Sequence, residues 1–478
     1  MNVKKTARLL ALAAAQCAAI ALAGCAAFSP DGGMAVVNEL AGSPLGTTVV
    51  ALRSEADEEK AREQTRALLK RPLWADDAVK IALLNNRTLQ AAYNALGISE
   101  AAMVGASLPP NPKFSIERIA GAGSVEIEAR AVANVLALAT LPVRASVAQD
   151  RFSQAQYEAA EVTLRIAGDA RRAYYRAIAA KVLADFLAQA QASAQSAAQL
   201  STRLGEVGTL NKLDQARNQV FYAELSAQLG TARQRAWSER ERLIRAMGLW
   251  GDDIAFKLPD ALPRLPARAA SLPSIEVEAI ARRLDLQSAR IEVSLLAKSY
   301  GLTQATRVLN LLEVAGISKR TREQGELIKE RGFEVEFEIP LFDFGQVKNR
   351  QAEEAYMQAV NRLAARAVMV RSEARDAYRK YRVGYDIAQH YQSEVLPLRK
   401  IISDETLLRY NAMQIDVFAL LTEARQRIAS TMSAIEAERD FWVAQTDLAT
   451  AILGGGATDS SGAAPSTAVT GGDTAGGH

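Results

Sequence analysis

The stretch RGFEVEFEIPLFDFGQ, residues 331–346, decides the fold of this chain. Apolar residues alternate with glutamates here, and this period of two places the two kinds of side chain on opposite faces of a β-strand. The apolar face holds Phe333, Val335, Phe337 and Ile339, and the other face holds Glu334, Glu336 and Glu338. We expect a strand from Arg331 to Leu341, either in a membrane or in a soluble sandwich.

The end of this stretch predicts a junction between a β layer and an α layer. Pro340 cannot donate a hydrogen bond to a sheet, so it marks the end of the strand. Asp343 and Gly345 favour a turn, and a long helical pattern begins directly after them. We therefore predict a strand-to-helix junction at Pro340, Asp343 and Gly345.

The N-terminus is typical of an exported lipoprotein. Basic residues precede an apolar run from Leu9 to Leu22, which is too short to cross a membrane as a mature helix. The run ends in Leu22-Ala23-Gly24-Cys25, which resembles a bacterial lipobox, with a chance cluster of small residues as the alternative. We expect a signal peptide over residues 1–24 and acylation of Cys25. Ala26 in the next position suggests sorting to the outer membrane by analogy with known lipoproteins.

Composition excludes several classes of function. Lys plus Arg (57) nearly balances Asp plus Glu (54), and no basic block indicates nucleic acid. Cys17 would leave with the signal peptide and Cys25 would carry lipid, so the mature chain offers no free thiol. His390 is the only non-terminal histidine, and no catalytic or phosphate-binding motif stands out. We predict no enzyme activity, no cofactor and no metal site.

The chain divides into two repeats flanked by less regular segments. Leu286-Gln287-Ser288-Ala289 follows Leu89-Gln90-Ala91-Ala92 at an offset of 197 residues, and Ala424-Arg425 follows Ala216-Arg217 at an offset of 208. The predicted boundaries are a lipidated arm (25–72), a first repeat (73–257), a Pro-rich linker (258–273), a second repeat (274–453) and a disordered tail (454–478).

Each repeat reads as a helix, two strands, a long helix, a tip and another long helix. The first has a helix from Asp76, short strands around Phe114 to Glu117 and Val125 to Glu128, and a helix of roughly 90 Å from Pro142 to Leu204. The second has a helix from Ser274 to Gln304, a strand from Val308 to Val314, the opening strand, and one long helix from Gly345 to a break near Asn411. The predicted fold is mainly α with a small membrane β layer.

Four strands with an apolar face cannot close a barrel, and an open edge in lipid leaves backbone groups unpaired at several kcal/mol each. Three chains would supply a 12-strand β-barrel, within the range of membrane barrels, and a 12-helix α-barrel continuing its wall. The sequence therefore predicts a homotrimeric conduit.

These residues resemble the TolC-like outer-membrane efflux proteins. Pro340-Leu341-Phe342-Asp343-Phe344-Gly345 is similar to the strand-to-helix junction of the family, and the resemblance extends over about Leu73 to Gly454. Arg87 stands where the family usually has Pro. The equivalent motif of the second repeat, Arg283-Leu284-Asp285-Leu286, also lacks the usual Pro. The junction of the first repeat, Thr140 to Arg144, lacks the Asp and Gly of its counterpart.

The resemblance implies partners and a location. They are a periplasmic adaptor, an inner-membrane transporter and outer-membrane lipid, for a lipid-anchored trimer that extends into the periplasm of a Gram-negative bacterium. The expected adaptor-contacting tips are Val207, Gly208 and Thr209 in the first repeat and Tyr410 and Met413 in the second, where Ala412-Met413-Gln414 replaces the Val-Gly turn of the family.

Two sets of carboxylates are candidates for the inside of the conduit. Asp214 and Asp416 could line the periplasmic aperture, with solvated helix faces as the alternative, because Ala419 and Thr422 replace the aspartates of some members. If the apolar strand faces meet lipid, the strand glutamates face the lumen, where they either favour cations or simply keep the bore wet. These candidates are Glu117, Glu126, Glu128, Glu334, Glu336 and Glu338.

We therefore expect the channel component of a tripartite efflux system, conducting passively. Two alternatives remain: the channel of a one-step protein secretion system, and a non-conducting coiled-coil lipoprotein that acts as a periplasmic spacer or adaptor. The sequence does not identify the cargo.

Overall fold

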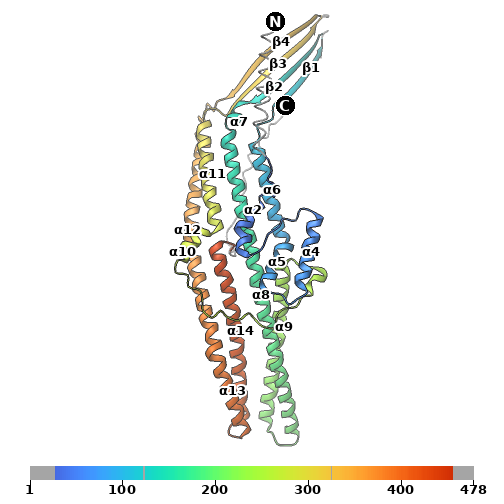
Figure 1. Cartoon of the computed structure of the whole chain (residues 1–478), viewed down its shortest axis with the longest axis vertical. Helices are drawn as coiled ribbons and strands as arrows, with labels where there is room; N and C mark the ends of the chain where they lie inside the picture. Colours follow the sequence, from blue (N-terminus) through green and yellow to red (C-terminus); the bar gives the residue numbers. More distant parts are fainter. Residues whose placement is uncertain (1–26, 122–123, 324–325, 456–478) are drawn as a thin grey trace.

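The computed structural model describes residues 27–121, 124–323 and 326–455. The predicted signal peptide, Cys25 and the tail beyond Gly455 lie outside the described residues. The molecule is elongated (Figure 1), with a β-sheet at one end, two helical hairpin tips at the other, and packed helices between them. No helix of the described part is long and apolar enough to cross a membrane.

The two repeats have the same order of elements. The first contains α5 (Ala75–Asn85), α6 (Arg87–Ser107), β1 (Lys113–Gly121), β2 (Ser124–Asn134), α7 (Val135–Ala139), α8 (Leu141–Glu206) and α9 (Lys212–Met247). The second contains α10 (Ile275–Arg282), α11 (Leu284–Thr306), β3 (Leu311–Glu323), β4 (Glu326–Glu338), α12 (Gln346–His390), η3 (Tyr391–Val395), α13 (Leu396–Asn411) and α14 (Val417–Leu453).

The prediction of one helix before each strand pair is wrong, because two helices stand there in each repeat. Asn86 and Arg283 adopt extended backbone, with ψ of 110° and 122°, and separate the two helices of each pair. The Asn86 side chain also accepts hydrogen bonds from the amides of Thr88 and Leu89, which caps α6. Arg87 is the first residue of α6, a position that Pro suits but does not need to occupy.

The predicted long helix from Gly345 to the second tip contains one irregularity. The π-helical turn η3 lies between α12 and α13, and His390 and Leu396 on either side keep right-handed helical backbone, so the chain stays helical up to Asn411. Pro397, the second residue of α13, has no amide hydrogen, which fits the altered hydrogen bonding at this turn. In contrast, α8 continues unbroken for 66 residues, which is about 100 Å at 1.5 Å per residue.

The strands form one antiparallel sheet in the order β1-β2-β3-β4. Both β3 and β4 are longer than predicted, because Lys319 to Glu323 pair with Glu326 to Glu330. β4 therefore begins at Glu326 and ends at Glu338, and not at Arg331 and Leu341. Its last backbone contact is the amide of Asn310 donating to the carbonyl of Glu338 at 3.0 Å.

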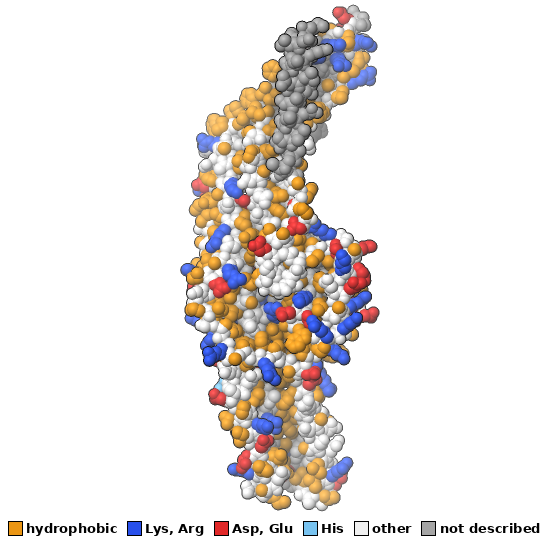
Figure 2. Space-filling view, viewed as in Figure 1, with side chains coloured by type: hydrophobic (Ala, Val, Ile, Leu, Met, Phe, Trp, Pro, Cys, Tyr) orange, Lys and Arg blue, Asp and Glu red, His pale blue; other side chains and the backbone are white. Residues whose placement is uncertain are grey.

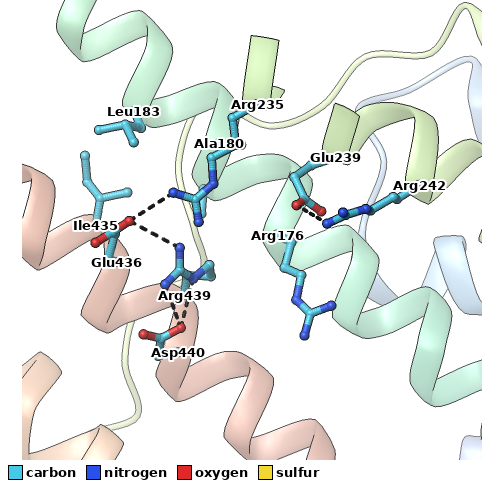
Figure 3. Close-up of a pocket in the computed structure, with 11 residues that line it drawn as sticks. Arg176, Ala180, Leu183, Arg235, Glu239, Arg242, Ile435, Glu436, Arg439 and Asp440 are labelled. Atoms are coloured by element: carbon cyan, nitrogen blue, oxygen red, sulfur yellow. Dashed lines mark hydrogen bonds and ion pairs between the residues drawn. The ribbon is translucent and has the colours of Figure 1, made fainter. Parts of the chain in front are cut away.

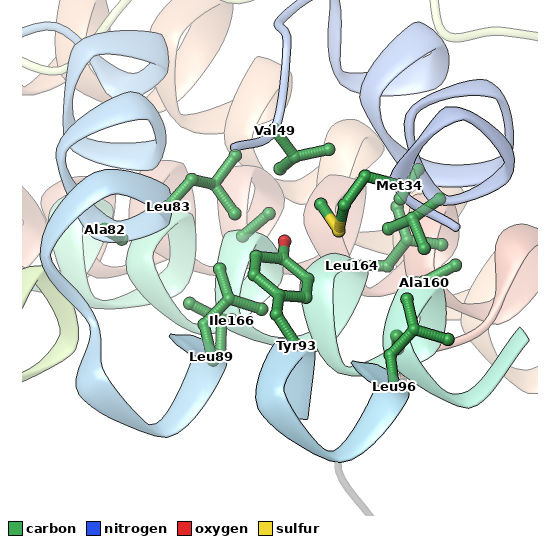
Figure 4. Packing of buried hydrophobic residues seen from close by; sticks show 14 of the residues in the cluster. Met34, Val49, Ala82, Leu83, Leu89, Tyr93, Leu96, Ala160, Leu164 and Ile166 are labelled. Carbon is green, nitrogen blue, oxygen red and sulfur yellow. The ribbon is translucent and has the colours of Figure 1, made fainter. Parts of the chain in front are cut away.

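The N-terminal arm packs against the first repeat. It comprises α2 (Met34–Val37), η1 (Asn38–Gly42), α3 (Ser43–Leu45) and α4 (Glu55–Leu69). Met34 and Val49 enter a core with Leu83, Tyr93 and Leu164 from α5, α6 and α8 (Figure 4). Burial of these apolar side chains is the main force that holds the arm on the body.

Aromatic side chains of the second repeat hold the linker between the repeats. Indole Nε1 of Trp442 donates to the carbonyl of Pro263, and the hydroxyl of Tyr385 donates to the carbonyl of Pro266. The amide of Ala270 donates to the hydroxyl of Tyr381 at 2.9 Å. The linker is therefore an ordered strap across the middle of the molecule.

Candidate functional site

The sheet separates its charges by face. In an antiparallel sheet directly paired residues lie on the same face, so the register assigns every strand residue to one side. Glu117 pairs with Glu128, and Glu128 pairs with Lys319 in the next strand. The six glutamates predicted to face the lumen all lie on this one face, as do Glu313, Glu323, Glu326 and Glu330.

Three cations share this acidic face and reduce its net charge. Lys319 lies 2.6 Å from Glu126, Arg130 lies 2.9 Å from Glu334, and Lys113 lies 3.8 Å from Glu313. The sequence prediction missed these partners, although the period of two that selects Glu126 and Glu128 also selects Arg130. Lys319 was missed because the predicted strand ended at Val314.

The opposite face of the sheet is apolar and exposed in the single chain. Phe333, Ile116 and Phe114 are 82%, 79% and 75% exposed, and Phe337 of β4 is 59% exposed. The strands hold no Asp or Glu on this face. Soluble monomers rarely expose an apolar surface of this extent, so this face marks contact with a partner or a membrane.

The three predicted junction residues form one compact turn at the end of the sheet. The amide of Phe344 donates to the carbonyl of Pro340 at 2.8 Å. One carboxylate oxygen of Asp343 accepts from the amide of Gly345 and the other from the amide of Val347. Gly345 has φ of 71°, and a Cβ there would overlap the backbone of Arg307 at the end of α11. Only glycine fits this close approach without strain.

The first repeat makes its junction differently. The short helix α7 follows β2 directly, and the side chain of Asn134 caps it by accepting from the amide of Ala137 at 2.7 Å. Pro142 then lies in the first turn of α8. Thr140 to Arg144 lack the Asp and Gly of the second junction, and the capped helix α7 makes the turn in their place.

The predicted tip residues lie at the far end of the molecule from the sheet. Val207, Gly208 and Thr209 join α8 to α9, and Val207 is 74% exposed. Tyr410 lies in the last turn of α13, and Met413, which is 93% exposed, lies in the turn before α14. Both tips are therefore free for contact in the described chain.

The two candidate aperture carboxylates have local roles in the helices that follow the tips. Asp416 caps α14 by accepting from the amide of Ala419 at 2.8 Å. Asp214 lies in the first turn of α9, where it pairs with Arg217 at 3.0 Å. In the first repeat, the residue equivalent to Asp416 is Asn211, which caps α9 by accepting from the amide of Asp214.

A charged pocket of about 330 Å³ lies where the two repeats meet, between α8, α9 and α14 (Figure 3). Arg235 of α9 reaches Glu436 of α14 at 3.2 Å, and Arg439 contacts Glu436 and Asp440. Two further ion pairs, Arg172 with Asp447 and Arg425 with Glu224, also join the repeats. Among the described residues, no group of His, Cys, Asp and Glu is placed to hold a metal ion.

Residues 275–451 match the sequence profile of a family described as "Outer membrane efflux protein". This segment runs from α10 almost to the end of α14. The second repeat is therefore similar to the outer membrane efflux proteins. The match confirms the resemblance on which the sequence interpretation rests. No curated protein sequence matches the chain significantly.

Solved structures of membrane channels show that the fold extends over both repeats. A structure of CusC, studied for folding and transmembrane channel formation, is 15% identical with a TM-score of 0.67, covering 80% of this chain and 92% of that one. The outer-membrane channel OprN is 16% identical with a TM-score of 0.67, covering 85% and 94%. The CmeC outer membrane channel of Campylobacter jejuni is 15% identical with a TM-score of 0.63, covering 84% and 86%. At this identity the likeness establishes the fold.

Proposed function

We propose that three copies of this chain form a channel through the outer membrane, which passively conducts substrate delivered by an inner-membrane pump through a periplasmic adaptor. The observation that carries this proposal is the sheet, with one face apolar and exposed and the other rich in glutamate. A sheet of this kind suits a wall between lipid and water, since lipid-facing and lumen-facing residues alternate along membrane strands.

The edges of the sheet support an assembly of several chains. β1 and β4 each pair with only one neighbouring strand in the described chain. In lipid, the unpaired backbone groups of these two edges would cost several kcal/mol each. Pairing β1 of one copy with β4 of the next satisfies both edges, and three copies of the four-stranded sheet give a 12-strand barrel.

The helices continue the same wall. Directly below the sheet lie α6, α8, α11 and α12, and the half toward the tips contains α8, α9, α12 with α13, and α14 (Figure 1). Three copies would close a 12-helix tube that opens at the tips near Gly208 and Met413, where we place the adaptor. Acylation of Cys25 would add a lipid anchor to each copy.

The spacer-lipoprotein alternative is weaker. A spacer in the periplasm would leave the side chains of Phe333, Phe337 and Phe114 in water on a contiguous face. Burial of apolar surface in lipid stabilises by roughly 25 cal/mol per Å², so this face favours insertion.

Conductance across a planar lipid bilayer tests the channel directly. We expect purified wild-type protein to give discrete conductance steps. Phe333→Glu with Phe337→Glu places charges on the lipid face and should abolish insertion, whereas the matched pair Glu334→Gln with Glu336→Gln on the other face should retain steps. Folded wild-type protein that inserts without conducting would overturn the proposal.

A further inference from the structure

The apolar face of the sheet ends in a group of cations near its two hairpins. We call these residues the basic patch: Arg118 of β1, Arg320 and Arg322 of β3, and Lys329 and Arg331 of β4. All five are exposed. Figure 2 shows Lys and Arg side chains gathered at the free end of the sheet, with hydrophobic side chains nearer the helices.

The basic patch differs from the other cations of the sheet in having no acidic partner. Lys319, Arg130 and Lys113, on the opposite face, each lie within 4.0 Å of a glutamate. Among the described residues, no carboxylate lies within that distance of any member of the basic patch, and its face of the strands holds no Asp or Glu. The glutamates adjacent in the sequence, Glu117, Glu323 and Glu330, point to the other side.

Cations of the basic patch are forced close together by the register. Arg320 pairs directly with Lys329, which places their Cβ atoms about 5 Å apart, and like charges in this position destabilise a sheet. Arg322 lies two residues from Arg320 toward the hairpin, and Arg331 lies two residues from Lys329 away from the hairpin, each about 7 Å along its strand. An anion between these side chains would remove the repulsion, and each guanidinium can bind a phosphate through two parallel hydrogen bonds.

The position of the basic patch points to the surface of a bilayer. From Phe333 to Glu338, where β4 ends, the strand rises about 17 Å at 3.3 Å per residue, or about 12 Å when tilted as in membrane barrels. Arg331 precedes Phe333 by two residues on the same face, and Arg118 follows Ile116 by two residues on β1, so both lie on the hairpin side of the apolar residues. Cations at the edge of an apolar band lie at headgroup depth.

We propose that the basic patch binds the phosphate groups of lipid headgroups in the leaflet at the hairpin end of the sheet. This inference rests on the proposed membrane location of the sheet and goes beyond conduction. The chemistry that a phosphorylated lipid shares with free phosphate is a terminal phosphate group with ionised oxygens, and the structure favours a lipid source because the apolar side chains of Phe333, Ile116 and Val335 lie on the same face as the cations. A headgroup with two phosphates can place one between Arg320 and Lys329 and the other at Arg322 or at Arg331.

The test measures lipid bound to the intact, delipidated protein by native mass spectrometry. The probes are a glucosamine lipid with two phosphates, its monophosphorylated form, phosphatidylethanolamine and inorganic phosphate. The variant is R320Q/R322Q/K329Q/R331Q, and the matched control is K319Q, which removes a cation from the other face of β3. A second variant, R320K/R322K/R331K, keeps the positive charges and is used if the first variant does not fold.

We expect wild-type protein to bind the bisphosphorylated lipid at least tenfold more tightly than phosphatidylethanolamine, with affinity falling at high salt. The glutamine variant should lose this preference, and K319Q and the lysine variant should keep it. Equal lipid preference in wild-type and glutamine variant would overturn the inference, as would displacement of the lipid by millimolar inorganic phosphate. Conductance of the same samples distinguishes the channel proposal from the lipid-site proposal. A glutamine variant that conducts but still prefers the bisphosphorylated lipid overturns only the lipid site.

Discussion

Gly208 and Met413 occupy the same position of the same turn at the two helical tips. Both have left-handed backbone, with φ of 76° and 57°. The amide of Gly208 donates to the carbonyl of Gly205, and the amide of Met413 donates to that of Tyr410, at 3.1 and 2.9 Å. The next amide of each turn, Thr209 or Gln414, donates five residues back. Each long helix therefore ends in a Schellman motif, although only one tip has the glycine that favours it.

The tips should respond oppositely to substitution. Gly208→Ala adds a Cβ in the left-handed region and should destabilise its turn by about 1 kcal/mol, whereas Met413→Gly should leave its turn at least as stable. Amide hydrogen exchange at Thr209 and Gln414 measures the two turns separately. Faster exchange at Gln414 in Met413→Gly, or unchanged exchange at Thr209 in Gly208→Ala, would contradict the equivalence.

A bulky β-branched residue at Gly208 should also weaken adaptor docking. Gly208→Val disfavours the positive φ of the tip, and no atom lies within 4 Å of the added Cβ, so the effect is on the backbone alone. We expect reduced recovery of the periplasmic adaptor in pull-down experiments. Thr231→Val on the exposed side of α9 is the control. Equal recovery of adaptor with both variants would argue against the tip assignment.

Gly345→Ala should destabilise the strand-to-helix junction by more than 2 kcal/mol. The substitution combines a left-handed φ with overlap of the new Cβ and the backbone of Arg307. Gly332→Ala is the matched control, since Gly332 lies in β4 with no atom within 4 Å of an added Cβ. Denaturant unfolding and the yield of assembled protein measure the difference, and equal values for the two variants would contradict the role of Gly345.

The acidic face should make the channel prefer cations. Glu336→Gln should lower the cation-over-anion permeability ratio roughly twofold, and Lys319→Gln should raise it, because both residues lie on the proposed lumen face. Arg331→Gln, on the opposite face, should leave the ratio unchanged. Reversal potentials in a salt gradient measure this ratio. No cation preference in the wild type, or no change after Glu336→Gln, would exclude a role of the glutamates in ion selectivity. They would then only keep the lumen hydrated.

The side-chain carboxyl of Glu161 in α8 should lower the free energy of unfolding as pH rises. Burial raises the pKa of its carboxyl above the usual 4.5, and Asp285 nearby raises it further. Between 4.5 and the raised pKa, the folded state holds more protons than the unfolded state, so stability falls with increasing pH. Glu161→Gln should therefore be more stable than wild type at pH 7, with a smaller difference at pH 4. Thermal unfolding at the two pH values measures this, and an equal difference at both would contradict it.

The two faces of the sheet could be predicted from the sequence because they depend on a local period. Alternation over Phe333 to Ile339 selects the same glutamates that the register places on one side. The strand ends could not be predicted in this way. Lys319 to Glu323 and Glu326 to Glu330 lack the alternation, and they are strand because β3 and β4 pair with each other.

The helix interruptions show a similar limit. The apolar pattern continues across Asn86 and Arg283 and hides the break, although Asn86 is a residue type that caps helices, as it does α6. The ion pairs of the acidic face depend on register, so no local pattern reveals that Lys319 meets Glu126. The equivalence of Gly208 and Met413 was hidden because methionine gives no turn signal.

The number of chains around the central axis tests the account most directly. Electron-microscopy class averages of the mature protein extracted in detergent measure this number and the particle length. We predict a hollow, three-fold particle of roughly 130 Å or more, the length of α8 at 1.5 Å per residue plus a barrel one bilayer tall. A monomer or a solid rod would contradict the shared barrel.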